Sequence, residues 1–370
     1  MQNKIIISML SMALFACGGG GSTSPAGDAP GDPNTPDQQP LTADEVKVGI
    51  PVQSRMSIAL SDFQPLAWGF LGNQIDVTVH LADRFGDPVV DGTVVNFVTE
   101  GGTIDDSCST VSSRCTVKWT GTLRRPGDTS DPSNALYVND RIGFSTITAY
   151  AEGDADFIDS NKNKVFDLGE PFVSYDEPFY EMDNVFVDGE RVKDDKEELL
   201  VDTDGNGVYS AKNPNIYQGT NCSAEAKAAG HCAQRMTIHT HATVVMSGEA
   251  QRVNVYPRVT PANVNGIGSY VAIIQDINRN IPASATSVSI TVSDGYELTG
   301  DSGSTKQYGV GELGDLSAYG VTDTHGAPFF FSVNDSDTDA TNNEDMIIEV
   351  EINRVNLAIL KVPFLAYDKP

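Results

Sequence analysis

The chain has 370 residues, of which 51 are Asp or Glu and 24 are Lys or Arg, and its formal net charge is -27 at pH 7. Such an excess of acid excludes a nucleic-acid-binding protein and disfavours attachment to anionic lipid by charge alone, because like charges repel. About 325 residues remain after a leader and a polar tether are set aside, which suits two domains.

The first residues have the layout of a secretion signal. Lys4 precedes an apolar stretch, residues 5–16, that is too short to cross a bilayer. The stretch ends Leu14-Phe15-Ala16-Cys17, which resembles the lipobox of bacterial lipoproteins. The resemblance implies a signal peptide at residues 1–16 and a lipid anchor on Cys17. Gly18, where aspartate would resemble an inner-membrane retention signal, favours the outer membrane. An ordinary signal peptide with an incidental cysteine is the alternative.

Residues 17–45 are expected to be a disordered tether. Between Gly18 and Pro40 the chain is mostly Gly, Pro, Ser, Thr, Asp, Asn and Gln, with almost no apolar residue that could bury a core. The lipid anchor would hold the folded part at the membrane through this tether. Whether that part faces the cell surface or the periplasm is left open.

Strand signals dominate the rest of the chain. Residues 75–81 alternate, with Ile75, Val77, Val79 and Leu81 on one face and polar side chains on the other. Further β-rich runs are residues 95–97, 116–120, 144–150, 237–246, 270–274, 288–292, 329–333, 347–352 and 357–364, and residues 225–229 could form one helical turn. Short strands separated by turns are typical of β-sandwiches. We predict an all-β protein of two immunoglobulin-like β-sandwich domains, residues 46–249 and 250–370.

A weak internal repeat favours two copies of one unit. Residues 81–88 and 274–282 each end a strand, continue through an Asp-led turn and a proline, and precede a second strand.

Residues 75–119 resemble bacterial immunoglobulin-like domains of the invasin/intimin type. The resemblance is carried by Leu81-Ala82-Asp83-Arg84-Phe85-Gly86-Asp87-Pro88-Val89, Asp91-Gly92-Thr93-Val94-Val95-Asn96-Phe97 and Glu100-Gly101-Gly102-Thr103-Ile104. It implies a two-sheet sandwich used as a spacer, adhesion or assembly module, and it implies no chemistry.

Four cysteines besides Cys17 fall into two pairs that are close in sequence, Cys108 with Cys115 and Cys222 with Cys232. An even number of cysteines outside the cytoplasm indicates disulfides, so we predict a bond within each pair. Zinc is the alternative, but the spacings of six and nine intervening residues are not those of zinc knuckles.

An acidic segment, residues 154–235, interrupts the first domain between two strand signals. Between Asp154 and Asp204 there are 17 Asp and Glu against 5 Lys and Arg. Acid concentrated in one segment indicates cation sites. The alternative is an acidic, mobile insertion that binds nothing.

The clearest motif in this insertion runs from Asp159 to Glu170. Oxygen-bearing side chains occupy positions 1, 3, 5, 9 and 12 of these twelve residues, as Asp159, Asn161, Asn163, Asp167 and Glu170. This is the ligand spacing of an EF-hand-type calcium loop, in which Val165 at position 7 would offer its backbone carbonyl. Position 6 is Lys164, where glycine usually permits the sharp turn. We predict a calcium site here.

A second copy of the motif begins at Asp202. Its ligand positions are occupied by Asp202, Asp204, Asn206, Val208, Ser210 and Asn213, and Gly207 stands at position 6. It lacks the terminal glutamate, so we expect weaker binding than at the first loop. A middle copy near Asp183 to Glu190 is degenerate, and whether it binds an ion stays open. These loops resemble the Asp/Asn-rich calcium loops of dockerins.

Enzyme motifs are weak. Gly300-Asp301-Ser302-Gly303 resembles the nucleophile segment of trypsin-like proteases. The segment that faintly resembles their histidine segment, Ala228 to Cys232 with His231, falls in the other predicted domain. His239 and His241 share one face of a predicted strand and could hold zinc, although two solvent-facing histidines are the commoner outcome. We therefore predict that the chain is not an enzyme.

These features together predict a calcium-stabilised, lipid-anchored outer-membrane protein. Its role would be adhesion or surface assembly, with a protein or glycan partner at the cell surface and no nucleic acid. A periplasm-facing structural lipoprotein without an external partner is the first alternative. A metal-dependent hydrolase using His239 and His241 is the second.

Overall fold

The computed structural model describes most of the chain beyond the predicted tether. The described residues are 47–127, 142–178, 186–187, 190–191, 201–202, 211, 213–233, 236–258, 268–284, 286–293, 295–299, 319, 326–335, 347–354 and 360–365. Within them the secondary structure is almost entirely antiparallel β-sheet. The prediction of an all-β fold is confirmed. The predicted signal peptide, Cys17 and the tether lie outside the described residues.

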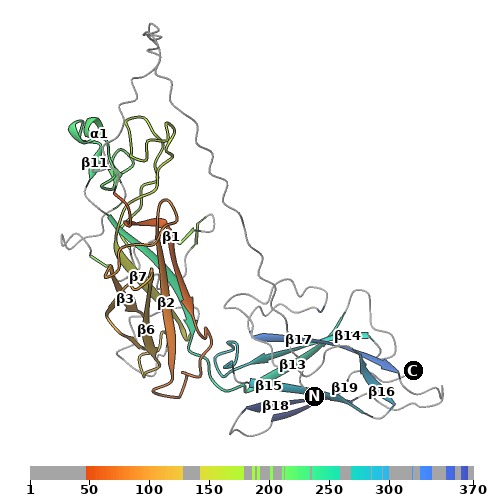
Figure 1. Cartoon of the computed structure of the whole chain (residues 1–370). Helices are drawn as coiled ribbons and strands as arrows, with labels where there is room; N and C mark the ends of the chain where they lie inside the picture. The colour runs from red at the N-terminus through yellow and green to blue at the C-terminus, as the bar shows by residue number, and fades with distance from the viewer. Residues whose placement is uncertain are drawn as a thin grey trace, which may run out of the picture. The chain divides into compact units, whose positions relative to one another are not determined.

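The first sandwich is formed by two four-stranded sheets (Figure 1). One sheet has the order β1-β2-β6-β4, from strands Pro51–Leu60, Gln74–Asp83, Arg114–Thr120 and Thr103–Ile104. The other has the order β12-β7-β3-β5, from strands Met236–Val245, Phe144–Gly153, Val94–Thr99 and Ser107–Ser109. Every strand predicted in this part of the sequence is present.

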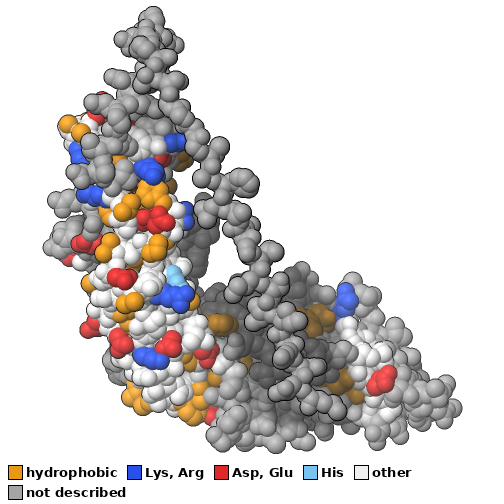
Figure 2. Space-filling view, in the orientation of Figure 1, with side chains coloured by type: hydrophobic (Ala, Val, Ile, Leu, Met, Phe, Trp, Pro, Cys, Tyr) orange, Lys and Arg blue, Asp and Glu red, His pale blue; other side chains and the backbone are white. Residues whose placement is uncertain are grey.

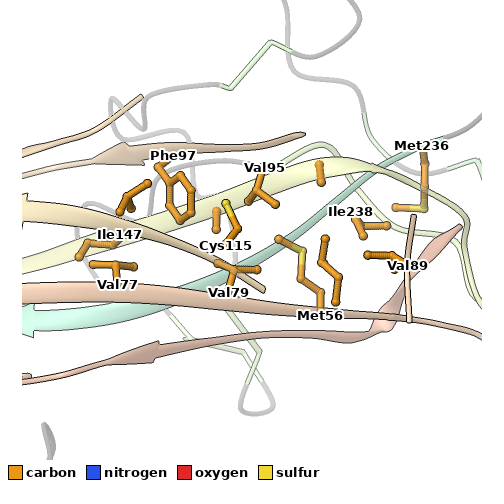
Figure 3. Packing of buried hydrophobic residues seen from close by; sticks show 14 of the residues in the cluster. Met56, Val77, Val79, Val89, Val95, Phe97, Cys115, Ile147, Met236 and Ile238 are labelled. Carbon is orange, nitrogen blue, oxygen red and sulfur yellow. The ribbon is translucent and has the colours of Figure 1, made fainter. Parts of the chain in front are cut away.

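The core of this sandwich follows from the alternating pattern of β2. Its apolar side chains, such as Val77 and Val79, are fully buried and face Val95 and Phe97 of the opposite sheet (Figure 3). Each fully buried aliphatic side chain contributes about 1.5–3 kcal/mol relative to exposure. Polar side chains occupy the other face of β2 and meet solvent, and Figure 2 shows acidic, basic and apolar groups interspersed over the visible surface.

Trp119 shows how tightly the core is packed. Its ring is fully buried, and its indole N–H donates a hydrogen bond of 2.9 Å to the carbonyl of Gly101. Gly102 lies against the ring with φ at +70°, and a Cβ atom there would come within 2.5 Å of the ring. Only glycine can combine this conformation with so close an approach.

Strand β1 was missed in the sequence, yet it connects the two sheets. Its C-terminal half pairs with β2, and its register shifts between Pro51 and Met56. On the N-terminal side of that shift, Val52 bridges to Asp154 beside the other sheet. Gln53 also accepts a hydrogen bond from the His239 N–H and donates one to the His239 carbonyl. The shift breaks the alternation by which a strand is recognised in sequence.

The second sandwich is built in the same way. Its sheets have the orders β13-β14-β17-β16 and β15-β18-β19. The first comprises strands Arg252–Pro257, Gly268–Gln275, Ala327–Asp335 and Tyr296–Thr299, and the second comprises strands Thr286–Val292, Ile347–Arg354 and Leu360–Leu365. Its core includes Tyr270 stacked on Phe331, with ring centroids 5.4 Å apart. The sequence analysis predicted these strands except β13 and β16.

The insertion lies between β7 and β12, and its described residues contain little regular structure. It contains a parallel pair of two-residue strands, β10 (Tyr217–Gln218) and β11 (Cys232–Ala233), and an antiparallel pair, β8 (Phe186–Val187) and β9 (Glu190–Arg191). Helix α1 (Ala224–Ala228) is capped by the Ser223 hydroxyl and matches the expected turn at 225–229. No helix among the described residues is long and apolar enough to span a membrane.

Candidate functional site

The candidate calcium loop, Asp159 to Glu170, rests on a cluster of aromatic rings. Phe166 lies inside the loop and is 2 % exposed, and it stacks on Tyr217 at a centroid distance of 4.6 Å. Phe157 and Phe172 meet both of these rings edge-on at distances between 5.3 and 6.1 Å. The cluster is continuous with the core of the first sandwich, so the loop is anchored to a rigid base.

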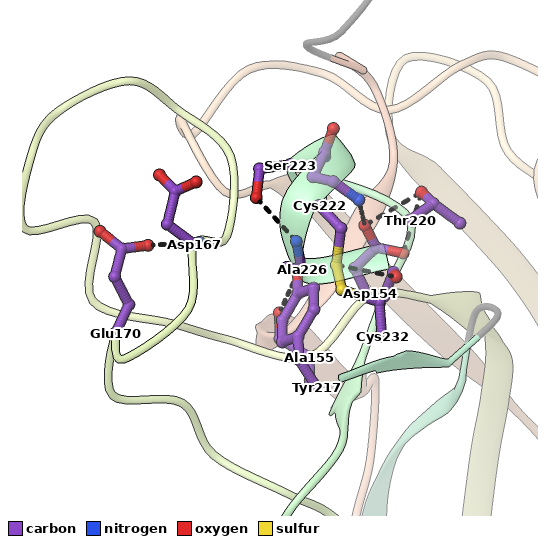
Figure 4. The surroundings of a disulfide bond; sticks show 12 residues. Asp154, Ala155, Asp167, Glu170, Tyr217, Thr220, Cys222, Ser223, Ala226 and Cys232 are labelled. Carbon is purple, nitrogen blue, oxygen red and sulfur yellow. Dashed lines mark hydrogen bonds between the residues drawn. A yellow bond between two sulfur atoms is a disulfide. The ribbon is translucent and has the colours of Figure 1, made fainter. Parts of the chain in front are cut away.

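The candidate calcium loop is also supported by the segment that the Cys222–Cys232 disulfide closes. The Phe166 N–H donates to the Asn221 carbonyl at 2.7 Å, and the Ser223 N–H donates to the Phe166 carbonyl at 2.9 Å. Cys222 stands between these two partners and is bonded to Cys232 (Figure 4). The disulfide therefore constrains the very segment that pairs with the middle of the loop.

The side chains at positions 1, 3 and 5 fold the loop. The Asp159 carboxylate accepts hydrogen bonds from the N–H groups of Asn163 and Lys164, at 3.1 and 2.9 Å. The amide oxygens of Asn161 and Asn163 each accept from the N–H two residues further on, at 3.0 Å in both cases. These local bonds turn the backbone around the three side chains.

The side chains at positions 9 and 12 close the loop. The Glu170 carboxylate is buried and accepts from the N–H groups of Ser160, at 2.7 Å, and Asp167, at 3.0 Å. One oxygen of Asp167 accepts from the side-chain amides of both Asn161 and Asn163. The structure thus joins all five predicted side-chain ligands in one hydrogen-bonded group. The Val165 side chain is buried, and its carbonyl belongs to the same turn.

The loop contains strained backbone at the position where the motif lacks glycine. Lys164 has φ at +71°, and Lys162 has φ at +64°. A left-handed conformation costs a non-glycine residue roughly 1–2 kcal/mol. The Lys164 ammonium lies 5.3 Å from the ring centroid of Phe85, and this cation–π contact offsets part of that cost.

The donor set suits a hard cation. It comprises three carboxylates, two amide oxygens and a backbone carbonyl, which is oxygen chemistry of the kind calcium prefers and zinc does not. Across the described part of the chain, no three His, Cys, Asp or Glu side chains are grouped closely enough to hold a metal by themselves. Amide and carbonyl oxygens would therefore have to complete any site in this loop.

Arg84 is a part of the site that the sequence analysis missed. Its guanidinium lies 3.4 Å from the ring centroid of Phe157 and donates to the Phe157 carbonyl at 3.4 Å. Burial lowers the pKa of Arg84, and nearby negative charge, including that of Asp159 and Glu170, opposes this shift. A fixed positive charge therefore lies beside the acidic loop. The sequence shows an arginine in the turn after a strand but not what that turn faces.

The second predicted calcium loop cannot be placed in the same way. Asp202 and Asn213 are described and exposed, whereas Asp204, Asn206, Val208 and Ser210 lie outside the described residues. The middle copy is described only at β8 and β9. The protease-like segment at Gly300 to Gly303 also lies outside them.

Both predicted disulfides are present. Cys108 and Cys115 have Cα atoms 5.8 Å apart, and Cys222 and Cys232 have Cα atoms 6.6 Å apart. Cys108 is in β5 and Cys115 is in β6, which belong to different sheets of the first sandwich. This disulfide therefore joins the two sheets.

The two histidines on β12 are in different environments. His239 is partly buried beside Gln53, and burial lowers its pKa, which a backbone hydrogen bond at Thr237 and the charge of Asp176 partly offset. His241 is exposed. Neither histidine belongs to a group of metal-binding side chains within the described ranges.

Comparisons with known proteins give only distant likenesses. No family model and no curated protein matches the chain. Among solved structures it is similar to the D0-D1 domain of intimin, at 11% identity and a TM-score of 0.22, over 84% of this chain and 97% of that one. It is also similar to the Yersinia pseudotuberculosis adhesin InvE, at 11% identity and a TM-score of 0.23, over 85% of this chain and 59% of that one.

A third similar structure is invasin, a bacterial integrin-binding protein, at 10% identity and a TM-score of 0.18, over 84% of this chain and 60% of that one. The chain spans about three fifths of the InvE and invasin structures. Scores this low carry no argument about function, so the fold assignment rests on the strand pairing described above.

Proposed function

We propose that this chain is a lipid-anchored outer-membrane protein whose two sandwiches carry a binding role in adhesion or surface assembly, and whose insertion is ordered by calcium. The observation that carries the calcium part is the hydrogen-bonded loop from Asp159 to Glu170. Its oxygen-bearing side chains belong to one hydrogen-bonded turn, and this turn rests on a base held by packing and by a disulfide.

Calcium would be held by the side chains at positions 1, 3, 5, 9 and 12 and by the Val165 carbonyl. The bound ion supplies positive charge that offsets repulsion among the acidic ligands. Asp159 and Glu170 also hold the backbone through their hydrogen bonds to N–H groups, so the same side chains fold the loop and would ligate the ion. Arg84 would provide a partly buried counter-charge for the loop when calcium is absent.

The binding role is supported by the architecture. Two sandwiches of antiparallel strands, with both disulfides in the first sandwich and its insertion, form a durable body for an oxidising compartment. The lipobox-like residues before Cys17 would tether that body to the membrane. The partner would be a protein or a glycan at the cell surface. A periplasm-facing structural role is the second candidate, and protease treatment of intact cells distinguishes the two.

Calorimetry on the mature protein tests the calcium proposal. We expect binding with a dissociation constant between about 10⁻⁶ and 10⁻³ M. The double substitution Asp159→Ala with Glu170→Ala should remove the tighter site, and Asp202→Ala with Asp204→Ala should remove the weaker one. Glu225→Ala is the matched control, because it removes an exposed acid from helix α1 of the same insertion. Absence of binding heat at millimolar calcium, with unchanged protease sensitivity of residues 154–235, would leave only an acidic insertion.

The binding role needs a separate experiment. Crosslinking in the outer membrane followed by purification, with and without calcium, should recover a partner at the cell surface. Recovery of the chain alone under both conditions, together with resistance to protease added to intact cells, would favour the periplasm-facing alternative.

A further inference from the structure

The turn that follows β2 is built around one buried carboxylate. One oxygen of Asp83 accepts hydrogen bonds from the N–H groups of Phe85 and Asp87, both at 2.9 Å. The other oxygen accepts from the N–H of Gly49, where the chain enters the first sandwich, at 3.0 Å. The carbonyl of Gly49 in turn accepts from the N–H of Val90 at 3.1 Å.

The turn that follows β14 repeats this arrangement. One oxygen of Asp276 accepts from the N–H groups of Asn278 and Asn280, both at 2.8 Å. The other accepts from the N–H of Gly248, where the chain enters the second sandwich, at 2.8 Å. The carbonyl of Gly248 accepts from the N–H of Ala283 at 3.1 Å. The two turns are therefore structural copies, residue for residue.

The second copy joins the second sandwich to the first. On the second sandwich, the contact is made by a side-chain amide, a backbone carbonyl and a serine. On the first, it is made by a loop before β2 and by Ile142, two residues before β7. The hydrogen bonds run from Asn280 Nδ2 to the Ile142 carbonyl (2.6 Å), from Gln64 Nε2 to the Pro282 carbonyl (3.1 Å), from Ser284 N–H to the Gln64 carbonyl (3.1 Å) and from Ser284 Oγ to Asp62 Oδ2 (2.6 Å).

In the first copy, the equivalent surface borders a hollow among the described residues. Asp87 stands where Asn280 stands in the second copy, and Asp91 stands where Ser284 stands; both are exposed. Next to them, Val90 is 64 % exposed and Val48 is 65 % exposed. Val48, Val90 and Asp91 line a hollow of about 800 Å³, together with the charged side chains of Lys47 and Glu152.

The chemistry of the hollow differs from that of the joined surface. In the second copy, the Ser284 hydroxyl donates to the acid Asp62. In the first copy, a carboxylate stands in that place and would repel an acid, so the Asp62 loop of a second copy of this chain does not fit. The two acids of the hollow, Asp91 and Glu152, outnumber its one base, Lys47, and two exposed valines lie beside them. This lining instead suits a cationic side chain next to an apolar one.

We propose that this hollow is a second joining surface, and that it takes a loop of a partner protein that carries Lys or Arg beside an apolar side chain. The proposal depends on neither calcium binding nor the lipid anchor. It goes beyond a general binding role, since it names the face of the molecule and the chemistry of what binds there.

The test uses two cyclised peptides with the sequence of residues 60–66, one unchanged and one carrying Asp62→Lys. Each is titrated into the mature protein while the valine methyl signals are followed by NMR. We expect the basic peptide to shift the signals of Val48 and Val90 and to leave the exposed Val173, in the insertion, unchanged. The acidic peptide should bind about tenfold more weakly. Asp91→Lys in the protein should reverse that preference.

Equal binding of both peptides, or no shift with either at millimolar concentration, would overturn the proposal. Sedimentation at increasing protein concentration measures the oligomeric state as a second test. A dimer that Asp91→Lys abolishes would assign the hollow to a second copy of the chain and overturn the choice of partner. A monomer with the charge-dependent peptide shifts supports it.

Discussion

The two disulfides should contribute similar free energies to two different parts of the molecule. Removing a disulfide releases the loop-closure entropy of the unfolded chain, which depends on loop length. For the sequence separations of 7 and 10 residues, this amounts to about 2.4 kcal/mol for Cys108–Cys115 and about 2.7 kcal/mol for Cys222–Cys232. On chain entropy alone, the two bonds are nearly equivalent.

Their positions in the structure are not equivalent. Cys108–Cys115 joins β5 to β6 across the two sheets, so its loss should lower the free energy of unfolding of the whole first sandwich. Cys222–Cys232 constrains the segment that pairs with Phe166. Its loss should loosen the insertion while the sheets stay intact, because the sheets are held by their own hydrogen bonds and core.

Hydrogen exchange on two paired alanine variants measures this difference. Cys222→Ala with Cys232→Ala should lower the protection of residues 154–178 and 213–233 by about 2.7 kcal/mol and leave β2 and β6 unchanged. Cys108→Ala with Cys115→Ala should lower protection in β2, β3, β6 and β7 together. Equal loss of protection in β2 for both variants would refute the view that the insertion is a separately stabilised unit.

Three further outcomes are expected. Lys164→Gly should raise the free energy of unfolding of the insertion by about 0.5–1 kcal/mol in urea titrations. Relief of the left-handed conformation outweighs both the loss of the Phe85 contact and the added freedom of the unfolded chain. A decrease in the free energy of unfolding would show that the Phe85 contact dominates. Cys17→Ser should release the protein from membranes, and a variant that still fractionates with the outer membrane would contradict the lipid anchor. Burial, with the charge of Asp156 and a hydrogen bond to it, raises the pKa of Tyr175 to about 12. The neutral Tyr175 hydroxyl therefore contributes its full stabilisation below about pH 10, and this is lost between about pH 10 and 12. Tyr175→Phe should flatten the fall in melting temperature over that range. An unchanged slope would contradict the raised pKa of Tyr175.

Much of the first sandwich could be read from local sequence. The alternation in β2 is a property of seven consecutive residues, and it identifies both the strand and its buried face. The disulfide pairs were predictable because each pair is close in sequence in a chain with secretion features. The spacing of Asp159, Asn161, Asn163, Asp167 and Glu170 was equally local, since their backbone hydrogen bonds reach only a few residues, apart from the closure of the loop by Glu170.

Other features depend on contacts between segments that are far apart in the chain. Strand β1 was missed because its register shift breaks the alternation, and its place is fixed by partners in both sheets. The aromatic base of the loop joins Phe157, Phe166 and Tyr217 from across the insertion, and no spacing in the sequence indicates that they meet. Arg84 became part of the site only because the turn after β2 lies against that base.

The two Asp-led turns show both kinds of information at once. The sequence determined that residues 81–88 and 274–282 are related, since a strand, an aspartate and a proline recur in the same order. Only the tertiary structure decided that Asp276 lies at a joined surface and Asp83 beside an open one. The physical reason is that a turn's own hydrogen bonds are set by its local residues, whereas its surroundings are set by whichever distant segment packs against it.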